Sequence, residues 1–554
     1  REIMDTIRQR IRSYSWTKLL TYFGITLAVV KLLLKIKAQL AEWERRKKIL
    51  LVLPTYKHNE PPHKYQPPVL ADINQFLPPG VKPSQDNVAR HSLSQLQRIQ
   101  NSVNKNDGVF MIWVVKPSVP GPPVGSIVVK DIKLIRQLLS TKMLPYLRKG
   151  LPYRISHPLI GDGVLATSGP TWHKQRIVLE KGFTPTLISK QYPLVLKTAN
   201  ELVARFHSLS LNSATEGATV DTIEEMLKTT LDVLGRVAFS YDFGSVTAAT
   251  KDEAPLYNAF DTILYGIAAR VRNPSLHVLR KVPFLPHNRK MNKSLNHLFE
   301  TIRKIIRSRV DKKNAVPQDL LDIMLSEVDP DSKSKLTQRE IMDNIATLLF
   351  AGHDTTAAAL TWFCYMIAKH PKVGEKILEE LSTTWGGKIT HENMEKSSYL
   401  NACTLEVLRL YPSAGFVRQT TEDIHLGNYL IPKHQDIYVF PYINQRNEDY
   451  YENAEEFIPE RWMKGDATEK LGFQARLARE SLQNPLLPFS LGKRNCVGRP
   501  LALLEIRLVL LRLLQEFDIR LPEEQHPLFQ ETPWMGLTAY PMHINLKFLP
   551  KKAK

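Results

Sequence analysis

Residues 489–498 have the sequence FSLGKRNCVG, in which Cys496 lies between two glycines, the second of them Gly498. Glycines permit a tight loop whose backbone N–H groups can approach the cysteine sulfur. Residues 501–517 follow with apolar residues at helical spacing, so a helix dipole would stabilise a thiolate, and Arg494 adds positive charge. A lone cysteine is more often a small buried apolar residue. These neighbours instead favour a thiolate that acts as a nucleophile or a metal ligand.

The cysteine content helps to decide what kind of site Cys496 belongs to. The chain has 554 residues and three cysteines, Cys364, Cys403 and Cys496. An odd number at wide spacing excludes a disulfide scaffold, and three are too few for a four-cysteine zinc or iron–sulfur site. A single thiolate with no second cysteine nearby fits a haem ligand better than a zinc ligand. The low cysteine content also predicts a reducing compartment.

The charge of the chain is strongly positive and unevenly distributed. The 75 Lys and Arg residues exceed the 55 Asp and Glu residues, and residues 1–50 alone hold twelve basic and four acidic residues. Such an excess indicates an anionic partner. Because the basic residues surround apolar ones instead of forming a polybasic tract, we expect a membrane surface and no nucleic acid.

Residues 1–50 predict an N-terminal membrane anchor. Residues 19–34 are apolar except for Lys31, and sixteen helical residues reach ~24 Å, less than the ~30 Å hydrocarbon core of a bilayer. Snorkelling of Lys31 and Lys35 would let so short a helix span the membrane, which is the favoured interpretation. A helix lying in the membrane plane and a targeting segment that is removed are the alternatives.

The rest of the chain divides into a connector and one large domain. Twelve of the 37 prolines lie between residues 54 and 123, which predicts a stiff connector over residues 51–90. Apolar residues then recur at helical spacing, and the β-like runs are short. We predict a single, mainly α-helical domain with small β-sheets over residues 91–550. The predicted helices include 341–369, 375–381, 399–410 and 501–517, and the β-like runs are 437–440 and 542–549.

Residues 489–498 resemble the F-x-x-G-x-R-x-C-x-G signature of the cytochrome P-450 family of haem-thiolate monooxygenases, and the resemblance covers about residues 90–550. It implies the fold of that family, preceded here by the membrane anchor. It also implies haem b, held non-covalently with the Cys496 thiolate as axial ligand. Phe489, Arg494 and Gly498 of the same segment then belong to the cofactor site.

Residues 351–356, AGHDTT, resemble the oxygen-activation motif that this family carries on a long helix crossing the haem. The resemblance implies that Asp354 and Thr355 are catalytic residues that deliver protons. Thr355 alone would be a helix threonine bonded to the carbonyl four residues earlier. A mid-helix Gly352 costs about 1 kcal/mol relative to alanine, which we expect to reflect a local opening of the helix. His353 is expected to point away from the iron.

Two further motifs imply supporting roles. Glu406 and Arg409 match the E-x-x-R of the family, and with Arg461 they are expected to form a buried network that braces the cysteine loop. Trp172 and Arg176 match its W-x-x-x-R and, with Arg494 and Arg418, are expected to bind the haem propionates through charge-assisted hydrogen bonds. Without the resemblance, Trp172 would be a core residue and Arg418 a solvated charge.

The resemblance also places the substrate pocket, whose walls are small or apolar and predict a lipophilic substrate. Fatty acids, sterols, terpenoids, carotenoids and foreign compounds all remain open. Ala351 replaces the glutamate that some fatty-acid-hydroxylating members esterify to haem, which excludes that attachment here. The expected lining is residues 160–165, Thr347, Ala351, residues 413–417 and residues 536–539.

The implied reaction inserts one atom of dioxygen into the substrate. The chain has neither a G-x-G-x-x-G after a strand nor a P-loop, so we expect electrons from an NADPH-dependent flavoprotein reductase, with cytochrome b5 as a further donor. Lys493 and Arg499 are the expected docking residues. A reductase-independent peroxide isomerase or dehydratase and a non-catalytic haem-binding protein are alternatives, and the Asp354–Thr355 pair argues against both.

The end of the chain bears on its location. Residues 551–554, KKAK, resemble a dilysine retrieval signal, although a solvated basic tail is an equally simple interpretation. Together with the predicted anchor, they favour the cytosolic face of the endoplasmic reticulum membrane. The alternative is an organelle envelope membrane, because of the basic amphipathic start of the chain.

Overall fold

The structure is a computed structural model, and the predicted anchor and connector lie outside the part that it describes. Among the described residues, no helix is long and apolar enough to cross a membrane. Residue 91, where the predicted domain begins, also lies outside the described residues, so this boundary stays a prediction. The described residues are 109–114, 124–211, 217–272, 276, 279–310, 318–463, 473–525, 534–535, 538–540 and 544–551.

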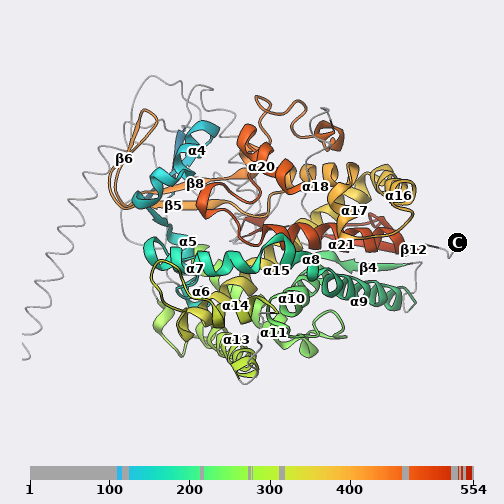
Figure 1. Cartoon of the computed structure of the whole chain (residues 1–554), viewed down its shortest axis with the longest axis horizontal. Helices are drawn as coiled ribbons and strands as arrows, with labels where there is room; N and C mark the ends of the chain where they lie inside the picture. Colours follow the sequence, from blue (N-terminus) through green and yellow to red (C-terminus); the bar gives the residue numbers. More distant parts are fainter. Residues whose placement is uncertain are drawn as a thin grey trace, which may run out of the picture.

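A five-stranded sheet lies at one side of the molecule (Figure 1). Strands β2 and β8 are parallel and the other neighbours are antiparallel. Helix α4 (Ile132–Leu139) shares with the sheet a small apolar core that includes Ile135, Leu426 and Ile437. The strand order is β1 (Val109–Val114), β2 (Val124–Val129), β8 (Asp436–Val439), β5 (Phe416–Thr420) and β3 (Leu147–Lys149).

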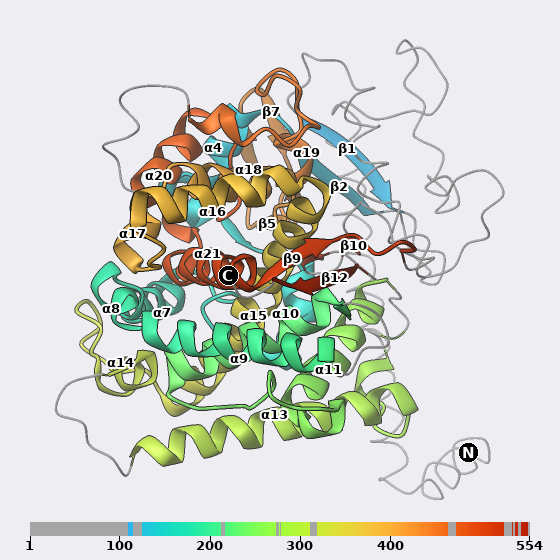
Figure 2. The ribbon, with the colours of Figure 1, turned by 90° about the vertical axis from the view of Figure 1, so that its right-hand side faces the viewer.

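A helical body with a second, larger apolar core makes up most of the molecule (Figure 2). Its helices are α5 (Leu151–Ile155), α6 (His157–Ile160), α7 (Gly169–Gly182), α8 (Pro185–Lys190), α9 (Tyr192–Leu211), α10 (Thr222–Phe239), α11 (Pro255–Arg272), α13 (Pro286–Val310), α14 (Leu320–Ser326), α15 (Gln338–Lys369), α16 (Pro371–Trp385), α17 (His391–Lys396), α18 (Tyr399–Leu410), α19 (Pro441–Asn444), α20 (Phe473–Gln483) and α21 (Arg499–Glu516).

Short strands and 3-10 turns complete the domain. The strands are β4 (Ala218–Asp221), β12 (Asn545–Pro550) and β9 (Phe517–Arg520) in one sheet, the pair β6 (Ile424–Leu426) and β7 (Tyr429–Ile431), and the pair β10 (Trp534–Met535) and β11 (Ala539–Tyr540). The turns are η2 (Thr141–Tyr146), η3 (Lys251–Glu253), η4 (Leu279–Lys281), η5 (Pro459–Trp462) and η6 (Gly492–Arg494).

Helix α15 passes through the centre of the helical body. It begins with a capping box, in which Thr337 Oγ1 accepts from the N–H of Glu340 and the Glu340 carboxylate accepts from the N–H of Thr337. Pro371 lies two residues beyond its end, where proline stops a helix. Most of its residues are buried around the whole circumference, which is typical of a helix inside a large core. It can therefore carry side chains to the middle of the domain.

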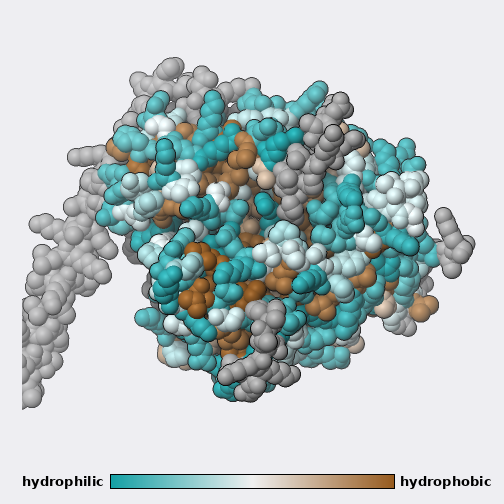
Figure 3. All heavy atoms as spheres, in the orientation of Figure 1, coloured by the Kyte–Doolittle hydropathy of each residue, from teal (hydrophilic) through white to brown (hydrophobic). Residues whose placement is uncertain are grey.

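The prediction of a mainly α domain with small β-sheets is confirmed. The predicted helices correspond to α15, α16, α18 and α21, and the β-like runs to β8 and β12. Several ends differ from the prediction. Helices α15, α16 and α21 begin two to four residues earlier, and α16 also ends four residues later. Phe517 does not end α21 but begins β9, where it pairs with Pro550 of β12. Hydrophilic residues dominate the face seen in Figure 3, as expected when the apolar residues fill the two cores.

Candidate active site

A cavity of about 260 Å³ lies where the five-stranded sheet meets the helical body. Strands β3 and β5 line one side of it, α15 lines a second, and the loop before α21 lines a third. Eight of the nine predicted site residues line this cavity, although they come from four separate stretches of the chain. They are Trp172, Arg176, Thr355, Arg418, Phe489, Arg494, Cys496 and Gly498; the ninth, Asp354, does not line it.

Cys496 is the only one of the three cysteines that lines the cavity. Its side chain is accessible because it opens into this space, whereas Cys364 and Cys403 are buried in the helical core. Its backbone N–H donates to the Phe489 carbonyl at 2.9 Å, which closes the loop. Burial raises the pKa of the Cys496 thiol, and the backbone N–H groups of Gly498 and Arg499, which hydrogen-bond to the sulfur, oppose this rise. The tight loop expected from the sequence is therefore present.

Two features fix the position of this loop. Helix α21 begins at Arg499, directly after Gly498, so the positive end of its dipole faces the sulfur. Gly492 has a φ of +68°, and a Cβ atom there would overlap the carbonyl oxygen of Leu139. Glycine is required at this position both for its backbone conformation and for the close approach to the end of α4.

Three cations that line the cavity have no acidic partner. The acidic residue in the same lining, Glu505, is buried, and burial raises the pKa of its carboxyl well above the usual value. Lys149 of β3 and Arg418 of β5 face each other directly in the antiparallel pair, and Arg494 lies near both. In the described part of the chain, no ion pair joins any of the three to an acidic residue. Burial, and then the charges of Arg418 and Arg494, hold the pKa of the Lys149 ammonium well below its usual value. Like charges opposite each other destabilise a sheet, so this corner of the cavity fits an anionic group.

The two propionate carboxylates of haem are such a group, and the cavity offers a thiol on a second wall. The donor set therefore fits haem. Sequence reasoning missed Lys149 because it belongs to no motif. Only the pairing of β3 with β5, two short strands far apart in the chain, brings it to Arg418.

Trp172 and Arg176 line the cavity from α7 but make different contacts. The Arg494 guanidinium lies 4.5 Å from the centre of the Trp172 ring, a cation–π contact. Arg176 donates to the carbonyl and the side-chain oxygen of Asn495, both at 2.6 Å, and pairs with Glu180 at 2.6 Å. Its guanidinium thus holds the cysteine loop against α7, and its role toward a propionate stays a prediction.

Helix α15 lines the cavity over residues 347–359, mostly with small residues and hydroxyls. Thr355 Oγ1 donates to the carbonyl of Ala351 at 2.7 Å, the back-bonded arrangement typical of helix threonines, and the hydroxyl still faces the cavity. The local opening expected at Gly352 was wrong, because α15 is continuous from Gln338 to Lys369. A Cβ atom at Gly352 would lie 2.9 Å from Leu234 of α10, so close helix packing explains this glycine.

Asp354 lies on another face of α15. Its carboxyl is buried and hydrogen-bonds to the hydroxyl of Thr538; burial raises its pKa to about 6, and the bond to Thr538 opposes this. His353 is also turned away from the cavity, as predicted: its Nδ1 lies 2.6 Å from the Leu349 carbonyl oxygen and its ring lies 4.9 Å from that of Phe260. Neither side chain reaches the cavity directly.

A second chamber of about 190 Å³ continues from the first. The two share Leu165, Ala351 and Thr355, among others. Together the two chambers are lined by most of the predicted pocket positions that the structure describes, but no motif in the sequence indicated the aromatic wall of the second chamber. Among the residues that the structure describes, no charged one lines this chamber. The aromatic wall consists of Tyr438, Phe440 and Tyr442, with Phe350 on α15.

The predicted network of Glu406, Arg409 and Arg461 is present. Glu406 accepts two hydrogen bonds from Arg409, at 2.8 and 2.9 Å, and one from Arg461 at 3.0 Å, and both Glu406 and Arg409 are fully buried. Arg409 also donates to the carbonyl of Gln445, whose side-chain oxygen accepts from the N–H of Leu487. Leu487 leads directly into the cysteine loop, so the network braces that loop through Gln445.

A cysteine thiol facing a cavity, a cluster of cations beside it that form no ion pair with the described residues, and a long helix passing over it are the features of a haem-thiolate protein. The chain belongs to the cytochrome P450 family, whose model matches residues 109–548. Its cofactor is therefore haem with cysteine thiolate ligation, and it is an oxidoreductase of the monooxygenase class.

Relatives and solved structures agree with this membership. Pentalenene oxygenase of Streptomyces avermitilis is 27% identical over 70% of this chain and 80% of its own length. The chloroplastic carotene epsilon-monooxygenase of Arabidopsis thaliana is 27% identical over 73% of this chain and 74% of its own. The crystal structure of the cytochrome P450DA heme domain has a TM-score of 0.71, covering 90% of this chain and 98% of that one at 22% identity, which shows the fold.

Proposed function

We propose that this chain oxygenates an elongated, uncharged lipophilic substrate with electrons from a partner reductase. The observation that carries the proposal is the uncharged second chamber, which extends the space beside Thr355 toward an aromatic wall. Such a chamber offers no counter-charge to a carboxylate or an amine on the substrate. Two relatives are named for oxygenating pentalenene and carotene, which supports a hydrocarbon-like substrate.

The proposed roles follow from position. Cys496 would hold the haem through its thiolate, and Phe489 and Gly498 hold the cysteine loop. Lys149, Arg418 and Arg494 would pair with the propionates, with Trp172 and Arg176 supporting them. When bound, the haem supplies the activation of dioxygen.

The reduction of dioxygen consumes protons, and side chains of this chain deliver them to the cavity. The Thr355 hydroxyl donates to Ala351, so its oxygen remains able to accept and pass on a proton in the cavity. Asp354 does not reach that space, but its partner Thr538 lines the second chamber, so the path proposed from Asp354 runs through the Thr538 hydroxyl. A carboxyl with a pKa of about 6 exchanges protons readily near neutral pH.

The proposed electron donor is an NADPH-dependent flavoprotein reductase, with cytochrome b5 as a further donor. Lys493 is exposed on η6 beside the cysteine loop, where an acidic partner can reach it, whereas Arg499 is half-buried. We also infer an anchor in residues 1–50 at the endoplasmic reticulum membrane, which rests on their basic and apolar sequence. The chloroplastic relative supports the organelle envelope as the alternative.

The test compares two threonines of α15. Thr355→Ala should raise the reductant consumed per product several-fold, because the hydroxyl that guides protons is lost. Thr361→Ala is the matched control: Thr361 makes the same bond to the carbonyl four residues earlier, at 2.8 Å, but is buried away from the cavity. Equal coupling in both variants would contradict the role of Thr355. Turnover of a hydroperoxide without any reductase would instead indicate a peroxide isomerase.

A further inference from the structure

A separate hollow of about 390 Å³ opens at the surface between α13 and the beginning of α15. Its lining comes from one face of the C-terminal half of α13 and from the first two turns of α15, and none of these residues lines the active-site cavity. The structure therefore places a second binding-sized space, hereafter the arginine groove, at the outer end of the helix that carries Thr355. The lining is Arg303, Ile306, Arg307, Gln338, Arg339 and Met342.

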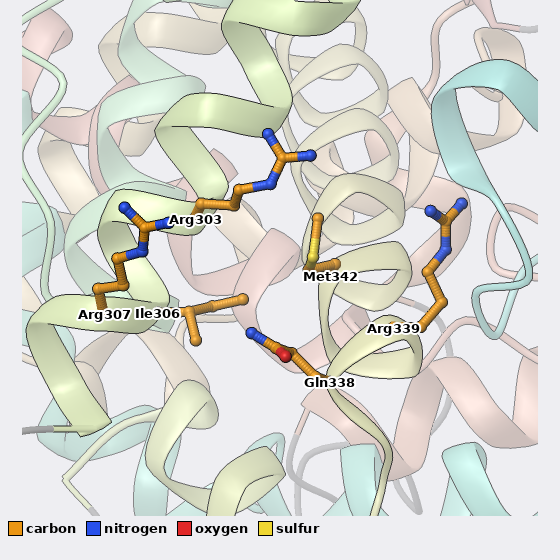
Figure 4. A pocket seen from close by; sticks show the side chains of 6 residues that line it. All are labelled: Arg303, Ile306, Arg307, Gln338, Arg339 and Met342. Carbon is orange, nitrogen blue, oxygen red and sulfur yellow. The ribbon is translucent and has the colours of Figure 1, made fainter.

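The groove is rich in positive charge. Figure 4 shows Arg303 and Arg307 extending from α13 and the Gln338 amide directed toward that side, whereas Arg339 extends across the far side of α15. Arg303 pairs with the exposed Glu300 at 2.6 Å, a pair worth under ~1 kcal/mol. Arg307 is exposed and has no ion pair within the described residues. The α13 wall thus presents more cationic groups than its own carboxylate can neutralise.

The carboxylates closest in the chain on the α15 side are already engaged. Glu340 pairs with Lys174 at 2.7 Å and accepts from the N–H of Thr337. Asp343 pairs with Arg339 at 3.0 Å and accepts from the N–H of Asp162. The N-terminal end of the 32-residue helix α15 adds positive potential on this wall. An anion in the groove would therefore meet arginines that have few competing partners.

The floor of the groove is apolar. Ile306 is buried and Met342 is half-buried. Arginine guanidinium groups match the oxygens of a phosphate group, which they bind through paired charge-assisted hydrogen bonds. The volume lies within the range of about 300–1,000 Å³ found for small-molecule sites, so it has room for more than a bare ion.

We propose that the arginine groove binds a phosphate group between Arg303 and Arg307 of α13 and Gln338 of α15. The site is independent of the oxygenation reaction and joins two helices that otherwise meet only through side-chain packing. The phosphate has two possible sources, a small phosphorylated solute and the head of an amphiphile whose chain covers Ile306 and Met342.

The experiment uses the full haem-loaded chain and isothermal titration calorimetry. The two probes are inorganic phosphate and octyl phosphate below its micelle concentration. The native protein is expected to bind at least one of the probes. The double variant Arg303→Gln/Arg307→Gln should bind that probe with an affinity at least tenfold lower, the loss expected when charge-assisted hydrogen bonds disappear. Lys290→Gln/Lys293→Gln is the control, because it removes two exposed positive charges from the same helix outside the groove.

Each outcome decides the proposal. Binding of inorganic phosphate that is lost in the arginine variant supports a solute site. Binding of octyl phosphate alone supports an amphiphile site, and in that case Met342→Gln should also weaken the binding of octyl phosphate. The absence of binding of either probe would overturn the proposal. An equal loss in the lysine control would also overturn it, by showing general attraction to a basic helix. An unchanged carbon monoxide spectrum of the reduced haem verifies that the variants are folded.

Discussion

Two of the buried clusters of charge in the described part of the chain are completed in opposite ways. In the first, Glu406 and Arg409 are wholly buried and every strong donor finds an acceptor in the chain, including three backbone carbonyls around Arg409. In the second, Lys149, Arg418 and Arg494 line a cavity together and form no ion pair with an acidic residue of the described part. The polypeptide itself supplies the counter-charge and acceptors of the first cluster, whereas the second cluster requires an anionic ligand.

This difference separates scaffold from site. A buried charge without a partner is costly, so a protein keeps unbalanced cations only where something else supplies the balance. The Glu406 cluster lies behind the cysteine loop and holds it through Gln445, whereas the Lys149 cluster lies at the cavity itself. Removing one charge from each should therefore have opposite effects on the haem-free protein.

The largest effect is expected from Glu406→Ala. It leaves Arg409 fully buried with no counter-charge, and breaking a buried pair in this way costs about 3–5 kcal/mol. The free energy of unfolding in urea and the yield of haem-loaded protein measure the loss. Glu460→Ala is the control, because Glu460 pairs with Lys376 while both are about half-exposed, and it should cost under ~1 kcal/mol. A similar loss in both variants would contradict the comparison.

A smaller effect of opposite sign is expected from Arg418→Leu. Without haem, the variant should unfold less readily than the native chain, because the like charge opposite Lys149 is removed. With haem, it should release the cofactor about tenfold faster, because one propionate partner is lost. Urea unfolding of the haem-free protein and transfer of haem to apomyoglobin measure the two effects. Arg409→Leu should instead weaken both forms, and if Arg418→Leu did so too, the cluster would be scaffold.

The smallest effect is a pH dependence at Lys149. The pKa of Lys149 lies well below its usual value in the folded protein, so below the usual lysine pKa the unfolded chain binds more protons than the folded one. The free energy of unfolding of haem-free protein must therefore rise with pH in that window. The stability advantage of Lys149→Met over the native chain should shrink by about 1 kcal/mol between about pH 7 and about pH 9. A stability advantage of Lys149→Met that does not change with pH would contradict a lowered pKa of Lys149 in the folded protein.

Much of the site could be predicted from the sequence because its residues lie in short motifs with fixed spacing. Cys496, Arg494 and Phe489 share one loop, and a loop fixes the relative positions of its own members. Lys149 and the aromatic wall of the second chamber could not be predicted. They reach the cavity only through the sheet, in which β3 pairs with β5 and β5 with β8, and such short strands far apart in the chain carry no sign of their partners.

Asp354 illustrates a limit of a different kind. Neighbouring residues on a helix point about 100° apart, yet Thr355 and Thr356 both line the cavity, so adjacency in the sequence could not decide whether Asp354 also faces it. The position of α15 among its neighbours decides this, and the structure turns Asp354 toward Thr538. Helix α18 was predicted at both ends because its apolar spacing stops at Tyr411 and Pro412, while the end of α21 passes into β9 without any residue that breaks a helix.

The position of β3 has a consequence for the life of the newly made chain. Among the described strands, β3 is one of the two edge strands of its sheet and pairs with β5 alone; its last residue, Lys149, faces Arg418 across that pairing. Until haem arrives, this edge is held against electrostatic repulsion and is the part of the sheet that opens most easily to a protease or to another unpaired strand. We therefore expect haem supply to influence how long each copy of the protein survives, as well as how many copies are active.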